Sequence, residues 1–77
     1  MYQFNTREKI EELRAKYPAG TRVVLDQMDD PQSPPAGTSG TVRCVDDMGD
    51  IHVAWNTGSS LALVPGVDKF HTVNEGE

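Results

Sequence analysis

Residues 40–55, with the sequence GTVRCVDDMGDIHVAW, decide the fold class of this chain. In their second half, Ile51, Val53 and Trp55 recur at every second position, so they share one face of an extended strand. The first six residues, GTVRCV, predict another strand with Val42 on its inner face. The intervening DDMGD predicts a short reversal, because its glycine can take the positive φ that such turns usually need.

The alternating pattern continues on the N-terminal side of these two strands. Val23 and Leu25 lie on one face of a strand that begins at Thr21. Residues 28–38, MDDPQSPPAGT, contain three prolines, which cannot donate to a strand ladder, and two aspartates, which favour turns. They therefore predict a long loop.

The C-terminal side predicts two further short strands. After a tight turn at residues 56–58, Leu61 and Leu63 alternate until Pro65 ends the fourth strand, and residues 70–73 form a closing strand. Five short strands, joined by one long loop and then by tight turns, are typical of an SH3-like barrel. The rival OB-fold needs a helix between its third and fourth strands, for which this chain has no room.

Residues 5–16 predict an amphipathic helix in front of this mainly β domain. Asn5 and Glu8 have the spacing of a capping box, and Pro18 ends the helix. Its apolar stripe consists of Ile10, Leu13 and Tyr17. The sequence leaves open whether this stripe packs on the chain's own barrel or on another molecule.

Length and composition indicate one small domain with three parts. We expect the helix in residues 1–17, the barrel in residues 18–73 and a disordered tail in residues 74–77. A second copy would add burial to so small a core, so homo-oligomerisation stays open. The lone Cys44 cannot form an internal disulfide, and no apolar run approaches the ~18–20 residues of a membrane span. With no signal-peptide pattern at the N-terminus, these features predict a cytoplasmic protein.

The net charge of −5 is unevenly distributed. Residues 1–16 carry four basic and three acidic side chains, whereas residues 17–77 carry three basic and nine acidic ones. The second segment would repel a phosphate backbone, which disfavours direct binding of DNA or RNA. A basic protein surface or peptide is the better electrostatic match.

The aspartates of the long loop are the most suggestive candidates for partner binding. Asp26, Asp29 and Asp30 flank the prolines, and carboxylates there can accept charge-assisted hydrogen bonds from Arg or Lys of a partner. The same residues also suit a turn that keeps the protein in solution. Both interpretations stay open.

Trp55 also has two interpretations. Its place in the alternating strand favours the core, but an aromatic residue at a strand end can line a groove and donate its indole N–H to a ligand. With Asn56 beside it, the second interpretation predicts a groove bounded by residues 26–38 and 55–60.

Metal and catalytic chemistry have little support in the sequence. The acidic turn at residues 46–50 lacks the spacing and the terminal glutamate of an EF-hand, so a simple turn is favoured. Zinc-binding side chains occur at Cys44, His52 and His71. No two of them have the sequence spacing of paired zinc ligands. No phosphate-binding glycine loop occurs, and no set of acid, base and nucleophile can be assembled. We therefore expect no cofactor and no enzymatic activity.

Several pieces of the sequence, in order, resemble a known family. They are GTRVVL, MDDP, PAGTSGTV, VDDMGDIHVAWNTGSSLALVPG and DKF, all within residues 18–73. Together they resemble the bacterial and phage domain-of-unknown-function family numbered 4314, which implies a small barrel from a phage or mobile element with no assigned activity. More distantly, residues 40–60 are similar to the GTV…V.WDNGS core of barrels that bind peptide tails. Asn56 stands where that pattern usually has aspartate, so this likeness supports a fold and not a ligand.

Two functions from different classes follow. The first is a protein-interaction module that accepts a basic or proline-containing segment. The second is a phage-encoded inhibitor of a host system, acting by acidic mimicry of nucleic acid or, as an oligomer, by sequestering a small nucleotide. Sequestration would require three basic side chains of the barrel to converge on an anion, namely Arg22, Arg43 and Lys69.

Overall fold

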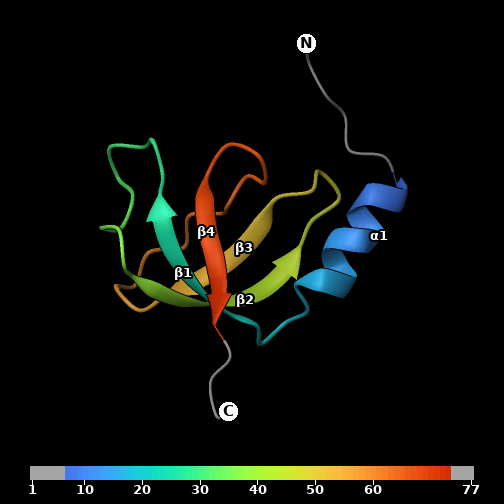
Figure 1. The fold of residues 1–77 in the computed structure, drawn as a ribbon, viewed down its shortest axis with the longest axis horizontal. Helices are drawn as coiled ribbons and strands as arrows, with labels where there is room; N and C mark the ends of the chain where they lie inside the picture. Colours follow the sequence, from blue (N-terminus) through green and yellow to red (C-terminus); the bar gives the residue numbers. More distant parts are fainter. Residues whose placement is uncertain (1–6, 74–77) are drawn as a thin grey trace.

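The computed structural model describes residues 7–73 as one helix and four antiparallel strands (Figure 1). In chain order these are α1 (Arg7–Lys16), β1 (Arg22–Gln27), β2 (Ser39–Val45), β3 (Ile51–Trp55) and β4 (Lys69–Val73). The strands form one sheet in the order β3-β2-β1-β4. The prediction of a mainly β domain preceded by a helix is confirmed.

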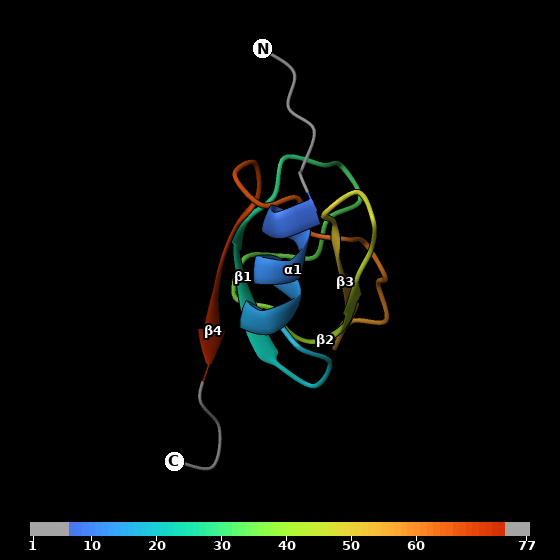
Figure 2. The ribbon, with the colours of Figure 1, turned by 90° about the vertical axis from the view of Figure 1, so that its right-hand side faces the viewer.

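The sheet is strongly curved, and α1 lies beside its open side. Figure 2 shows α1 in front of the space between the β1–β4 pair and β3. Two irregularities in the ladder accompany the curvature, one between Val42 and Cys44 on β2 and one between Leu25 and Gln27 on β1. Such bulges bend a strand and increase its twist.

The sheet has four strands where the sequence predicts five. At the position of the expected fourth strand, Leu63 alone pairs with Ile51, through N–H···O=C bonds of 2.9 and 2.7 Å in the two directions. Leu61 does not extend this pairing, and its carbonyl instead accepts the indole N–H of Trp55 at 2.9 Å. The described chain therefore has one bridge at this position and does not form the five-stranded barrel.

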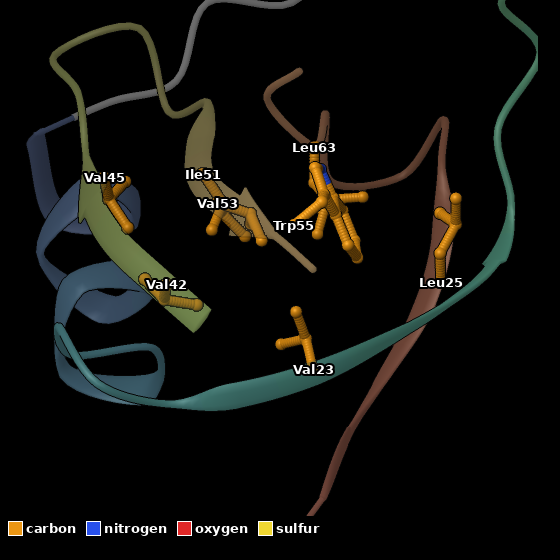
Figure 3. Close-up of a cluster of buried hydrophobic side chains, with 8 residues drawn as sticks. All are labelled: Val23, Leu25, Val42, Val45, Ile51, Val53, Trp55 and Leu63. Atoms are coloured by element: carbon orange, nitrogen blue, oxygen red, sulfur yellow. The ribbon is translucent and has the colours of Figure 1, made fainter. Parts of the chain in front are cut away.

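The core lies inside the curve of the sheet. Every buried hydrophobic side chain of the main cluster comes from β1, β2, β3 or the segment beside β3 (Figure 3). The cluster consists of Val23, Leu25, Val42, Val45, Ile51, Val53, Trp55 and Leu63. Alternation therefore predicts the inner face of β1 and β3 and the inward side chain of Val42. Beyond Val42 the bulge of β2 breaks the pattern, so Cys44 is exposed and Val45 is buried.

The helix packs on the chain's own sheet. Leu13 and Tyr17 lie against the core cluster, and Ile10 is buried. Arg14 fastens the helix to the end of β2, where its Nε donates to the carbonyl of Val45 at 3.1 Å and its Nη2 donates to Asp47 at 2.8 Å.

Some expectations concern residues that the structure does not describe. The predicted cap at Asn5 and the predicted tail at residues 74–77 both lie outside residues 7–73. Within the described part of the chain, no helix combines the length and the apolar character that a membrane crossing requires.

Candidate functional site

Parts of three loops lie at one end of the molecule. In both ribbon views, residues 46–50, residues 64–68 and the part of the long loop that follows β1 lie at the upper end, while the rest of residues 28–38 returns to the start of β2 (Figures 1 and 2). Together they contain six aspartates and no lysine or arginine. We call this surface the acidic end.

Asp46 is the aspartate of the acidic end most engaged in its own turn. One of its oxygens accepts the backbone N–H groups of Met48 and Asp50, both at 2.9 Å, and the other lies 2.8 Å from Nε2 of His52. Partial burial raises the pKa of the Asp46 carboxyl, but the hydrogen bonds from His52, Asp50 and Met48 and the charge of His52 outweigh it, so the pKa is lowered. This carboxylate builds the turn between β2 and β3.

The two aspartates within the long loop have different surroundings. Asp30 caps a local turn, because its carboxylate accepts the N–H of Gln32 at 2.8 Å and its carbonyl accepts the N–H of Ser33 at 3.0 Å. Asp29 is exposed, and its carboxylate makes no hydrogen bond or ion pair in the described part of the chain. Asp29 is therefore the carboxylate of this loop most available to a partner.

Asp26 lies at the base of the long loop, on the outer face of the sheet. Both of its carboxylate oxygens are 3.0 Å from Nδ1 of His71, which links β1 to β4. Asp26 thus belongs to the β1–β4 pair, whereas Asp29 and Asp30 belong to the loop.

The structure places Trp55 in the core and Asn56 on the surface. Only 3% of Trp55 is exposed, and its indole N–H is engaged by the carbonyl of Leu61. The N–H of Asn56 donates to the carbonyl of Ser39 at 2.9 Å, so the turn after β3 meets the start of β2, directly after the long loop. In this structure a partner would contact Asn56 rather than the indole.

Sequence reasoning missed a set of exposed apolar side chains at the acidic end. The exposed fraction is 65% for Met48 and 70% for Val67. Val64, in the same loop as Val67, is also exposed. The sequence contains a sign of this exposure. These apolar residues lie in the turn segments DDMGD and VPGVD, where no strand periodicity directs a side chain inward. The acidic end is therefore both negatively charged and partly apolar.

Two of the three basic residues of residues 18–73, Arg22 and Lys69, lie at opposite ends of the β1–β4 pair. Arg22 is half-buried on the outer face, where its Nη1 donates to Thr41 at 2.7 Å. Arg43 is exposed at the bulge of β2. Lys69 pairs with Gln27, five residues along β1 from Arg22, which is about 16 Å at the usual rise of a strand. The described chain alone does not bring Arg22 and Lys69 together around one anion.

The candidate metal ligands do not gather at one place. Cys44 and His52 occupy opposed positions on β2 and β3, whereas His71 lies on β4 beside Asp26. Within residues 7–73, no group of three or more Cys, His, Asp or Glu side chains is arranged to hold a metal ion.

The comparisons with known proteins give one match. The family described as Domain of unknown function (DUF4314) matches residues 6–73, a range that includes α1 and all four strands. No curated protein and no solved structure matches the chain.

Proposed function

We propose, from the premise that this chain belongs to the family Domain of unknown function (DUF4314), that it is a non-enzymatic module that binds a basic segment of another protein. We place this role in the cytoplasm, in the context of a phage or another mobile element. The observation that carries the proposal is the acidic end, where three loops gather carboxylates and exposed apolar side chains.

Charge and apolar surface support this type of partner together. Asp47 already pairs with Arg14 of α1, and the other five aspartates of the acidic end favour the approach of Lys and Arg and steer a cationic segment towards the loops. Met48 and Val67 offer apolar area that such a segment would cover on binding. A segment that alternates basic and apolar or proline residues fits both properties.

The strand order supports an SH3-like arrangement as part of the proposal. The order β3-β2-β1-β4 has Leu63 beside the outer edge of β3, and the long loop connects β1 to β2. In this arrangement the segment around Leu63 occupies the position of the fifth strand of the barrel. The loops of the acidic end would then border the ligand.

The alternative function is acidic mimicry of nucleic acid, for which the same aspartates are the support. Exposed apolar side chains such as Met48 and Val67 have no counterpart in a phosphate backbone, so they favour the protein-interaction proposal. The separation of Arg22 from Lys69 gives no support to sequestration of a nucleotide by one copy.

The test reverses the charge of the long loop. Asp29→Lys combined with Asp30→Lys should weaken binding of a synthetic peptide of alternating lysine and leucine by roughly tenfold or more, as measured by calorimetry. It should also remove basic proteins from those captured out of a host lysate. A control pair with the same charge change on the exposed face of α1, Glu8→Lys with Glu12→Lys, should bind like the wild type.

Two outcomes would contradict the proposal. Unchanged peptide binding and capture after the loop substitutions would remove the acidic end from the binding surface. Capture restricted to nucleic-acid-binding proteins, with competition by duplex DNA, would favour mimicry instead.

A further inference from the structure

β4 forms one edge of the sheet and pairs only with β1. No described residue pairs with its other side, and Figure 2 shows β4 at the margin of the molecule. Four of its five residues are exposed, and Phe70 is half-buried. The opposite edge is different, because Leu63 and Ser59 both bond to the outer side of β3.

The direction of the backbone groups on β1 follows from its bonds to β2. The N–H of Leu25 donates to Thr38 at 2.9 Å, and the carbonyl of Leu25 accepts the N–H of Gly37 at 2.7 Å. The groups of Leu25 therefore face β2. Because backbone groups alternate in direction along a strand, those of Val24 face β4.

This direction determines which groups of β4 lie on its outer edge. Val24 is opposite His71, so the N–H and C=O of His71 face β1. The neighbouring residues Phe70 and Thr72 consequently direct their N–H and C=O groups away from the sheet. These outward backbone groups of Phe70 and Thr72 have no hydrogen-bond partner in the described part of the chain.

The outer edge of β4 also lacks most protective features of edge strands. Natural edges are usually blocked by charged residues, proline, bulges or a covering element. β4 has a lysine only at its first position, Lys69, and its remaining sequence, FHTV, contains no proline and no carboxylate. Such a strand is open to pairing with another strand.

We propose that a second copy of this chain adds its own β4 antiparallel to this edge, about a two-fold axis at His71. In that register Phe70 lies opposite Thr72 of the second copy, and Thr72 lies opposite its Phe70. Each of these pairs exchanges two backbone hydrogen bonds, so every outward group of both residues gains a partner. No other register within Lys69–Val73 pairs both residues with each other.

The charges are compatible with this symmetric pairing. Lys69 faces the uncharged Val73 of the second copy, and each His71 at the axis lies 3.0 Å from the carboxylate of its own Asp26. β4 begins directly after residues 64–68, so antiparallel pairing directs the two acidic ends in opposite directions. Repulsion between the two acidic ends is thereby reduced by distance and by salt.

The experiment measures mass and amide exchange over a range of concentrations. By light scattering, the wild type should approach twice its mass of 8.5 kDa as concentration rises. The amides of Phe70 and Thr72 should exchange more slowly at high concentration, because they become hydrogen-bonded only in the dimer.

Two variants separate this interface from any other. Thr72→Pro removes an N–H that points away from β1, so it should leave the fold intact by circular dichroism and abolish dimerisation. His71→Lys keeps a nitrogen that can donate to Asp26 but places two lysines opposite each other at the axis, so it should also give a monomer. The control, Ala54→Lys, adds the same side chain to the exposed face of β3 and should remain dimeric.

Three results would overturn the inference. A wild type that stays monomeric at the highest soluble concentration excludes the dimer. A dimer that persists in folded Thr72→Pro or His71→Lys uses another surface. Protection of Phe70 and Thr72 only after addition of a foreign polypeptide assigns the edge to a different strand. These outcomes are independent of whether the acidic end binds a basic segment.

Discussion

At the scale of single residues, Asp46 illustrates why an acidic turn need not be a binding site. The sequence DDMGD offers three carboxylates, but the Asp46 carboxylate already accepts bonds from two backbone N–H groups and contacts His52. Local geometry thus assigns this residue to the turn. The Asp29 carboxylate, in contrast, makes no hydrogen bond or ion pair within the described residues and stays available.

The acid sensitivity of the fold should depend in part on Asp46. Its pKa in the folded chain lies below the ordinary value of 3.8, so its stabilisation is fully present above that value and is lost as pH falls through the folded-state pKa. Asp46→Asn should lower the free energy of unfolding at neutral pH by about 1 kcal/mol, because it replaces charge-assisted hydrogen bonds with weaker ones.

Urea unfolding at a series of pH values checks this expectation. The difference in unfolding free energy between wild type and Asp46→Asn should shrink as the solution is acidified below about pH 4. The control Asp29→Asn should follow the wild-type curve. A difference that stays constant down to about pH 2 would show that the carboxylate charge does not contribute.

At the scale of elements, side chains of β3 lie directly against Gly40 of β2. A Cβ at this position would lie 2.5 Å from Cγ1 of Val53 and 2.8 Å from Cε3 of Trp55. Both contacts are with packed core side chains of β3. Gly40 therefore allows Trp55 to cover the inner face of β2.

Gly40→Ala should destabilise the protein by about 1–3 kcal/mol, since the added methyl group overpacks the core. Chemical denaturation followed by circular dichroism measures the change. Ser60→Thr, which adds a methyl group to an exposed side chain, should change stability by less than about 0.5 kcal/mol. Equal stability of Gly40→Ala and the wild type would mean that the side chains of Val53 and Trp55 can shift at little cost.

At the scale of the whole molecule, one cluster connects elements that are distant in sequence. Its side chains come from three strands and from Leu63, and Leu13 and Tyr17 bring the end of the helix against it. The only tryptophan, Trp55, lies within this cluster. A core shared in this way favours a single cooperative transition.

Thermal unfolding should therefore give the same midpoint by two independent probes. Tryptophan fluorescence reports the core, and far-ultraviolet circular dichroism reports the helix and the sheet. The two curves should coincide at a low, fixed protein concentration, where association does not change the midpoint. Two separated transitions would indicate that α1 or β4 unfolds independently of the core.

Local patterns along the chain were sufficient for much of the architecture. The period-two segments identify the inner faces of β1 and β3 and of β2 as far as its bulge. The prolines identify the long loop, and the ordered pieces of residues 18–73 identify the family. The helix is also visible, through the stripe that includes Leu13. These features depend on residues close in sequence, so the sequence alone determines them.

The tertiary structure decided the features that depend on distant partners. The segment around Leu63 forms one bridge where alternation predicts a strand, and the carbonyl of Leu61 accepts the indole N–H of Trp55. Likewise, folding gathers the loops of the acidic end, brings Asp26 to His71 and leaves the outer edge of β4 unpaired. A hydrogen-bond acceptor, a charge or a strand edge is engaged or left open only by what lies beside it in space, and that neighbour is set by the packing of the whole chain.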